Sequence, residues 1–257
     1  MTIQRPSDAM GPIFWHAPQA PVPINTPIVV GEHECVVASL DGAILGVIPT
    51  GSHWMHPQPF PFLSRCIDPQ SNIRAELWFV TTARVEGIKC GGSLGEVLDA
   101  QTEVHCSPRA IFGFSVKVTD PLRLVNGVMS QSMESDGLIE WVKAMVMKKA
   151  KETLAHYAMG GGSLLGPKLS AELSAEIPKL TDLDVCGLQI AGVGDVMMNF
   201  SQDDITALKQ ASVAKAAAKR EAMANAQPAA QLRCGRCGVA HAGGRFCTSC
   251  GAPLQNA

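Results

Sequence analysis

Short apolar runs separated by turn residues dominate the first half of the chain. The runs are rich in valine, isoleucine and aromatic residues, which favour strands. Asp41-Gly42, between two of these runs, is a strong hairpin signal. The predicted strands are 28–30, 34–39, 43–48, 75–85 and one or two within 102–118. We therefore expect a largely antiparallel sheet region.

Apolar residues recur at helical spacing after residue 118. Asp120 can cap a short helix that begins at Pro121. A long helix is predicted over 135–159, and three glycines at 160–162 end it. Further along, the pattern predicts a helix at 168–176, a strand at 181–196, and an Ala-rich helix from a capping signature at 201–204 to about 226. Strands first, then helices with one strand among them, predict an α+β fold.

Prolines punctuate residues 1–27, which we expect to form an extended N-terminal arm. Ile13-Phe14-Trp15 is its strongly apolar part. Because exposed apolar clusters are uncommon, this trio is expected to pack on the body of the protein. Contact with a partner is the alternative.

Two Cys-x-x-Cys pairs with nine residues between them lie near the end of the chain. A glycine follows each pair, so the backbone can turn back toward a metal ion. A segment this short cannot bury enough apolar surface to fold unaided, and metal binding would supply its folding energy. The sequence predicts a zinc ribbon with one structural Zn²⁺ held by Cys234, Cys237, Cys247 and Cys250. Redox dithiols or a disulfide pair are the alternative.

The composition is that of a folded globular protein, with 46% hydrophobic and 17% charged residues. Aromatic residues make up 5%, which argues against base-stacking surfaces. Residues 209–257 carry seven Lys and Arg against one Glu, so the tail contributes +6 and residues 1–208 contribute −8 to the net charge of −2. No apolar run is long enough for a membrane span and no secretory signal is recognisable, so we expect a cytoplasmic protein. Any attachment to a membrane would be peripheral or through a partner.

Four further constellations could carry chemistry. Gly161–Lys168 could be a phosphate-binding loop, and His53 with His56 could bind a metal ion. In two further pairs, Cys106 with His105 and Cys35 with His33, the cysteine could be a nucleophile and the histidine its base. The loop follows a helix where a phosphate loop needs a strand, and the two metal-ligand candidates lie among prolines without a third ligand. Adjacent strand residues face opposite sides, so His105 cannot activate Cys106. We expect no active site and no enzymatic activity.

An opening strand at 28–37, a hairpin segment at 40–47 and a turn segment at 48–55 follow one another in the sequence. In this order they resemble the SPFH or band 7 superfamily, which includes stomatin, prohibitin and flotillin. The resemblance extends to the bacterial virion-core-protein-like branch, which joins an SPFH domain to a C-terminal zinc ribbon. Segments 13–15, 75–80 and 112–121 also fit that branch. Pro49-Thr50-Gly51 stands where glycine-proline-glycine is more usual.

The resemblance implies four regions: the arm at 1–27, an SPFH domain at 28–198, the Ala-rich helix and linker at 199–228, and the ribbon at 229–257. It also implies a cytoplasmic scaffold that forms homo-oligomers and presents its ribbons to protein partners, at a membrane surface or in a stress response. A nucleic-acid-binding or adaptor protein is the alternative, since Arg233, Arg236 and Arg245 lie on or beside the ribbon. The acidic body and the few aromatic residues argue against nucleic acid.

Overall fold

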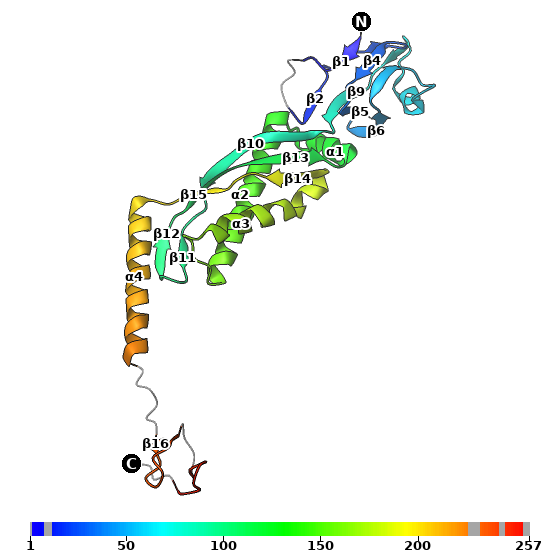
Figure 1. Cartoon of the computed structure of the whole chain (residues 1–257). Coiled ribbons are helices and arrows are strands. Elements are labelled where there is room, and N and C mark those ends of the chain that lie inside the picture. The colour runs from blue at the N-terminus through cyan, green and yellow to red at the C-terminus, as the bar shows by residue number, and fades with distance from the viewer. Residues whose placement is uncertain (1, 8–11, 226–231, 242–244, 254–257) are drawn as a thin grey trace. The chain divides into compact units, whose positions relative to one another are not determined.

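The computed structural model describes residues 2–7, 12–225, 232–241 and 245–253. The chain divides into two compact units, Met1–Ile205 and Thr206–Ala257. Within the described residues the fold is mixed α+β with several antiparallel sheets, as the order of elements predicts (Figure 1).

Two small sheets form the N-terminal part of the first unit. One has the order β1 (Ile3–Gln4), β4 (Pro27–Val30) and β7 (Gly51–Trp54), and the other has the order β2 (Phe14–His16), β9 (Glu76–Thr81), β5 (Glu34–Leu40) and β6 (Ala43–Ile48). A short ladder of β3 (Val22–Pro23) with β8 (Asn72–Ile73) and the 3-10 helix η1 (Pro61–Cys66) complete this part. The predicted β5–β6 hairpin is confirmed, and Asp41 and Gly42 at its turn both have positive φ.

The N-terminal residues are built into these sheets. Ile13 is fully buried, and Phe14 in β2 pairs with Val80 in β9, so the predicted packing of this apolar segment on the body is confirmed. Side chains from β4, β5, β6 and β9 meet in one core, which includes Ile28, Phe79 and their buried neighbours.

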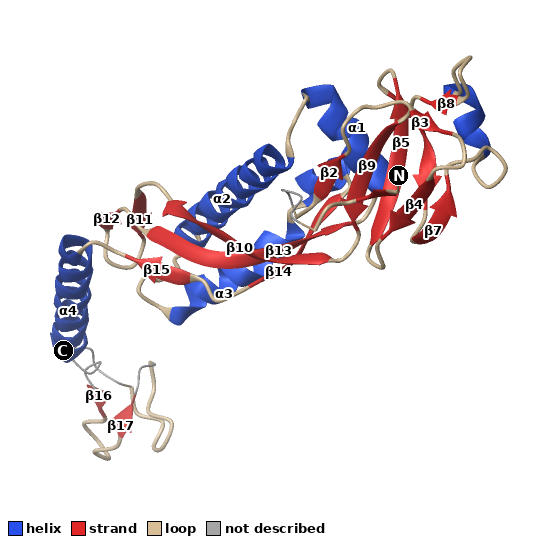
Figure 2. Ribbon diagram, turned by 90° about the horizontal axis from the view of Figure 1, so that it is seen from above, coloured by secondary structure: helices blue, strands red, loops and turns tan. Residues whose placement is uncertain are grey.

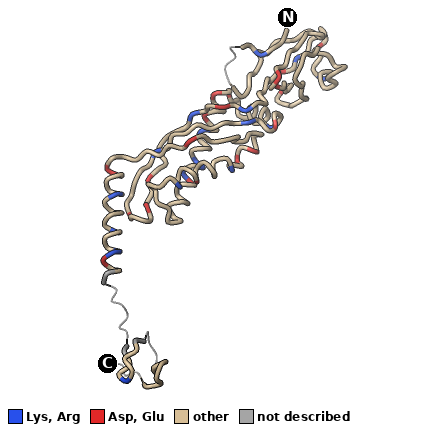
Figure 3. Tube along the Cα trace, in the orientation of Figure 1, with Lys and Arg blue, Asp and Glu red and all other residues tan. Residues whose placement is uncertain are grey.

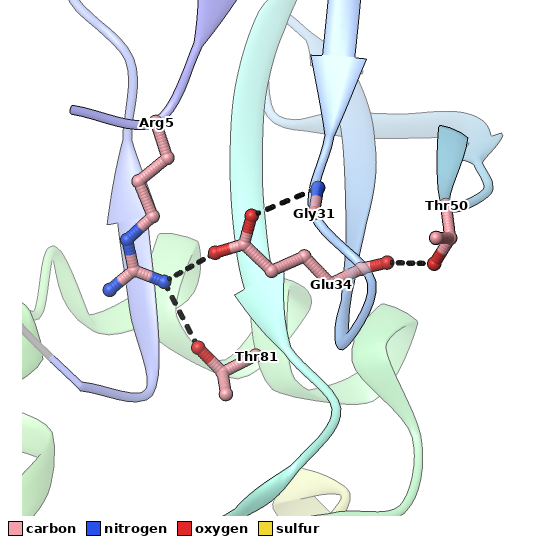
Figure 4. Close-up of polar contacts among 5 residues, drawn as sticks. All are labelled: Arg5, Gly31, Glu34, Thr50 and Thr81. Carbon is pink, nitrogen blue, oxygen red and sulfur yellow. Dashed lines mark hydrogen bonds and ion pairs between the residues drawn. The ribbon is translucent and has the colours of Figure 1, made fainter. Parts of the chain in front are cut away.

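Arg5 and Glu34 attach the chain's first described segment to this core region. Arg5 Nη1 donates to Glu34 Oε1 at 2.9 Å and to Thr81 Oγ1 at 3.0 Å (Figure 4). Glu34 Oε2 accepts from the Gly31 backbone at 3.3 Å, and Thr50 Oγ1 donates to the Glu34 carbonyl oxygen at 2.8 Å. The two charged side chains are only 14% and 19% exposed, so this ion pair is partly shielded from water.

A further sheet, which is antiparallel throughout, and three helices form the rest of the first unit. Its strands are β10 (Arg84–Ser93), β13 (Arg109–Val118), β14 (Leu188–Val193) and β15 (Met197–Asn199), and a separate hairpin is formed by β11 (Val97–Asp99) and β12 (Val104–Cys106). The helices are α1 (Pro121–Gln131), α2 (Ser135–Met159) and α3 (Pro167–Glu176), followed by the 3-10 helix η2 (Ile177–Lys179). Helix α2 packs against both α3 and β10, and Figures 1 and 2 show it running beside the strands of this sheet.

The helix boundaries follow the local sequence. Asp120 Oδ1 accepts from the backbone N–H groups of Leu122 at 3.0 Å and Arg123 at 3.1 Å, which confirms the predicted cap of α1. The long helix occurs as predicted over Ser135–Met159. Its buried residues recur every four positions and form one apolar stripe: Leu138, Val142, Val146, Ala150 and Leu154.

The strand predicted over 181–196 is wrong in its first part. Residues Thr181–Cys186 form a 3-10 helix, η3, and only Leu188–Val193 pair as β14. Gly187 between them has φ 65°, and a Cβ there would lie 2.2 Å from the Asp120 carbonyl oxygen. Val185 lies in η3 and is 77% exposed. The close approach of the Asp120 backbone fits only a turn at Gly187, so the strand begins after this glycine although the residues before it favour strand structure.

Most of β10 is not predicted by the sequence. This strand contains Gly87, Gly91 and Gly92, which have no side chain to support a pattern of alternation. Gly87 has φ 74°, at a register shift between Val85 and Ile88. A bulged, glycine-rich strand is formed here by pairing along the whole length of β13.

Asp99 is a fully buried carboxylate that joins two distant loops. Its Oδ1 accepts from the backbones of Gln101 and Thr102 and from the Thr102 hydroxyl, at 2.9–3.1 Å. Its Oδ2 accepts from the Leu164 backbone at 2.9 Å. The first three close the turn between β11 and β12, and the fourth holds this hairpin against the loop that follows α2.

The second unit begins within the helix α4 (Gln202–Asn225), close to the predicted 201–226. Ser201 Oγ accepts from the Asp204 backbone at 3.0 Å, in agreement with the predicted cap. From Ser212 to Met223 every residue of α4 is exposed. None of the helices in the described residues combines the length and apolar character that a membrane crossing requires.

Candidate metal centre

Two similar backbone turns bring four cysteines together in the second unit. In the first, Cys234 N donates to the Val239 carbonyl at 3.0 Å and Gly238 N donates to the Cys234 carbonyl at 2.8 Å. In the second, Cys247 N donates to the Ala252 carbonyl at 2.7 Å and Gly251 N to the Cys247 carbonyl at 2.9 Å. The short strands β16 (Leu232–Arg233) and β17 (Ala240–His241) pair beside the first turn.

The glycine after each cysteine pair is required by the backbone. Gly238 has φ 73° and Gly251 has φ 70°, a region that residues with a Cβ rarely adopt. Each turn can therefore close and direct both of its sulfur atoms to the same side. This is the role that the sequence predicts for these two glycines.

The four sulfur atoms form a compact group. Cys234 Sγ lies 3.6 Å from Cys250 Sγ, Cys237 Sγ lies 3.5 Å from Cys247 Sγ, and all four lie within 4.8 Å of one another. Sulfur atoms at the corners of a tetrahedron around one zinc ion would be about 3.8 Å apart, given a zinc–sulfur bond of about 2.3 Å. The separations are far longer than a disulfide bond of about 2.05 Å. The arrangement fits one metal ion held by Cys234, Cys237, Cys247 and Cys250.

Backbone N–H groups favour negative charge at each of the four sulfurs. The N–H groups of Cys237 and Arg236 donate to Cys234 Sγ and lower the pKa of its thiol to about 6. At Cys250 the N–H of Ala252 favours the thiolate, but the hydrogen bonds with the Cys237 and Cys247 sulfurs outweigh it and raise the pKa to about 12. Neighbouring thiolates repel one another, and a divalent cation removes this repulsion.

The candidate centre lies at the surface of its unit. Cys234 and Cys247 are buried, Cys250 is partly buried and Cys237 is exposed. No other group of three potential ligands from His, Cys, Asp and Glu converges in this way in the described residues. An ion could reach the site directly from solvent on the Cys237 side.

The two histidines near η1 have packing roles in the structure. His53 Nε2 lies 3.0 Å from the Pro49 carbonyl oxygen, and its ring makes an edge contact with Phe60. His56 Nδ1 accepts from the Gln58 backbone at 3.0 Å. Both rings therefore have partners within the protein fold.

The two candidate Cys–His pairs do not form. His105 and Cys106 face opposite sides of β12: the side chain of His105 is 66% exposed beside Glu96, and Cys106 is buried. Likewise His33 is exposed and Cys35 is buried. Burial raises the pKa of both thiols to about 11, which disfavours the nucleophilic thiolate.

The loop 161–168 differs from a phosphate-binding loop. It follows α2, as predicted, and its Leu164 N–H is already bonded to the buried Asp99 carboxylate. A second anion would be repelled there. A cavity between β2 and the start of α2 is not predicted by the sequence, because its lining residues come from distant segments that no motif connects.

Comparison with known proteins gives the chain no family. No protein-family model matches it, and no curated protein is significantly similar to it. The resemblance to SPFH or band 7 proteins therefore stays a prediction from the motif order.

Proposed function

We propose that the protein is a non-enzymatic scaffold of the SPFH or band 7 type, whose copies self-associate through the first unit and through α4, and whose second unit ends in a zinc ribbon that recruits partner proteins. One observation carries the proposal: four cysteine sulfurs converge within 4.8 Å in a short segment. An ion bound by four protein sulfurs has no open position for a substrate. The ribbon would therefore present a surface rather than catalyse a reaction.

The ligand set supports zinc as the metal. Four thiolates in a tetrahedral arrangement suit zinc or iron, and zinc ribbons use two knuckles of this spacing. The order of β4, β5, β6 and β7 over residues 27–54 supports the SPFH part of the proposal, since the family's opening strand, hairpin and turn occur in this order.

The composition of α4 supports self-association. Val213 is 68% exposed and Met223 is 70% exposed, on a helix rich in alanine. A helix with so little apolar contact is marginal by itself, and packing against the same helix of other copies would bury these side chains. Assembly would place many ribbons together, and multivalency would raise the avidity for a partner.

Light scattering on the full chain tests the assembly. The proposal predicts a particle of many chains, which Ala217→Pro disrupts because proline breaks the interior of α4. Gln202→Pro is the matched control, since proline is tolerated at the first helical position. A monomer at every concentration, with α4 intact by circular dichroism, would contradict self-association.

Nucleic-acid binding is a second candidate that one observation favours. Arg236 and Arg245 are exposed, and the described ribbon residues include no Asp or Glu. The basic positions Lys209, Lys215, Lys219 and Arg220 on α4 add positive charge (Figure 3). Binding to a DNA duplex or to single strands that weakens steeply with salt, and that Arg236→Ala and Arg245→Ala each reduce, would favour this candidate over the scaffold.

A further inference from the structure

One face of the sheet formed by β10, β13, β14 and β15 carries an exposed apolar pair. Helix α2 lies against the other face, where a Cβ at Gly92 would be 3.5 Å from Met147 Cε. Successive strand residues point to opposite faces, so the cross-strand partners Gly91 and Ile111 belong to the face away from α2. Ile111 is 47% exposed, and Met197, its partner in β15, is 59% exposed. Directly opposed side chains lie side by side, so the two form one apolar spot.

Two cations flank this apolar spot. Arg109 lies two residues before Ile111 in β13, and Lys89 lies two residues before Gly91 in β10, so both share its face. Both are exposed, and no ion pair joins either of them to another described residue. The loop before β15 adds one acidic residue, Asp195. The face is positive here although residues 1–208 carry a net charge of −8. We call the group the sheet patch: Lys89, Arg109, Ile111 and Met197.

The 3-10 helix η3 presents the complementary side chains. Asp182 and Asp184 are exposed, Val185 is 77% exposed, and Leu183 among them is buried. Within the described part of the chain neither carboxylate takes part in an ion pair. We call Asp182, Asp184 and Val185 the η3 knob. The knob is acidic and apolar, and the sheet patch is basic and apolar.

The knob and the patch of one chain lie at opposite ends of the sheet. Only Gly187 separates η3 from β14, whose Leu188 pairs with Val118 in β13. Helix η3 also packs against α1, which follows Val118. Ile111 is seven residues away from Val118 along β13, a distance of about 24 Å at about 3.4 Å per residue. The η3 knob therefore meets a sheet patch only on a second chain.

We propose that the η3 knob of one chain docks on the sheet patch of a second copy. Its two carboxylates meet two cations, and Val185 covers Ile111 and Met197. The charges select the partner surface, and the apolar contact adds burial. Because the two surfaces differ, the contact repeats head to tail and builds a ring or an open filament. This inference rests on the proposed self-association and names the surfaces that the first unit uses for it.

Charge reversal in the full chain tests the contact. In light scattering, Asp182→Lys/Asp184→Lys should raise the concentration at which half of the chains are assembled by about tenfold, because two attractions become repulsions. Lys89→Glu/Arg109→Glu should have the same effect. An equimolar mixture of the two variants should assemble like the natural protein, since every knob then meets a patch of opposite charge.

The matched control is Lys151→Glu/Lys168→Glu, which reverses two exposed charges outside the sheet patch and should leave assembly unchanged. All the substituted residues are exposed, so the variants should fold, and circular dichroism checks this. Unchanged assembly of either reversed variant, or a mixture that does not assemble, would overturn the inference.

Other occupants of the sheet patch give a different result. If Lys89→Glu/Arg109→Glu abolishes binding to a DNA duplex or to phosphatidylserine vesicles and leaves assembly intact, the patch serves that ligand and the inference is wrong. If the natural chain assembles and the reversals change nothing, only this contact fails. A natural chain that is monomeric at every concentration would contradict both the scaffold proposal and the contact, so the two failures are distinguishable.

Discussion

The two units of this chain differ in what holds them together. The first unit buries large apolar side chains from many elements, among them Phe79, Leu154 and Leu173. In the described ribbon residues, Cys234 and Cys247 are buried while Phe246 is 63% exposed. Apolar burial of the first kind stabilises a fold by itself, whereas the ribbon has little apolar surface to bury. A metal ion held by the four cysteines would take the place of a core in the second unit.

Removal of one sulfur ligand should have the largest effect. Cys247→Ser should unfold the ribbon, because the apparent binding free energy of structural zinc in such segments is about 10–16 kcal/mol. The amide NMR spectrum should lose the dispersed ribbon signals and keep those of the first unit. Ser249→Ala, in the same knuckle but without a ligand atom, is the control. If the dispersed ribbon signals persist in Cys247→Ser, the ribbon does not depend on the metal ligand for its fold, and this difference between the two units is contradicted.

A core substitution should affect only the first unit. Phe79 is fully buried, so Phe79→Ala should lower the free energy of unfolding of that unit by about 3–5 kcal/mol. Denaturant unfolding measures the loss, and metal analysis should show an unchanged zinc content. Val185→Ala, at a residue 77% exposed, should change stability by less than about 0.5 kcal/mol.

Asp99→Asn should produce a smaller loss. The amide would direct N–H groups at a site where backbone N–H groups already point, so one or more buried donors would lose their acceptor. We expect about 2 kcal/mol of destabilisation in the first unit by denaturant unfolding. Asp195→Asn, at an exposed carboxylate, is the control. Equal stability of the two variants would show that the four hydrogen bonds contribute little.

The smallest expected effect is the loss of stability in acid that Asp68 causes. The backbone N–H of Asn72, followed by the side chain of Asn72, the backbone of Gln70 and the side chain of Arg74, lowers the pKa of Asp68 despite opposing burial. This carboxylate therefore stabilises the fold above its unfolded-state pKa of about 3.9, and the contribution is lost as the pH falls through the lower folded-state pKa. The midpoint temperature of thermal unfolding of the first unit should fall more steeply below pH 4 in the natural protein than in the Asp68→Asn variant. Parallel pH profiles would contradict this role.

Local signals in the sequence predict much of the fold. The Asp41-Gly42 turn and the Asp120 cap are decided within a few residues, so short-range chemistry is enough to place them. The four cysteines are likewise predicted by spacing alone, since each knuckle is a local turn. Long helices are predicted well because their apolar residues repeat over many turns.

Other features depend on contacts between distant residues. The backbone turns at Gly187, where the Asp120 carbonyl oxygen leaves no room for a Cβ atom. Strand β10 contains several glycines and is formed by pairing with β13. His16, Trp78 and Ser135 meet only after three segments have packed together. No single-sequence pattern records such contacts, so neither these elements nor the cavity could be predicted.

A native mass spectrum of the full chain, purified without chelator, tests the central claim most directly, because it counts chains and metal ions together. The account predicts an assembly of many chains with one zinc ion for each chain. A particle without zinc and with four unpaired thiols per ribbon would contradict the metal-held second unit. A monomer with one zinc would leave the ribbon in place and contradict the self-assembling scaffold.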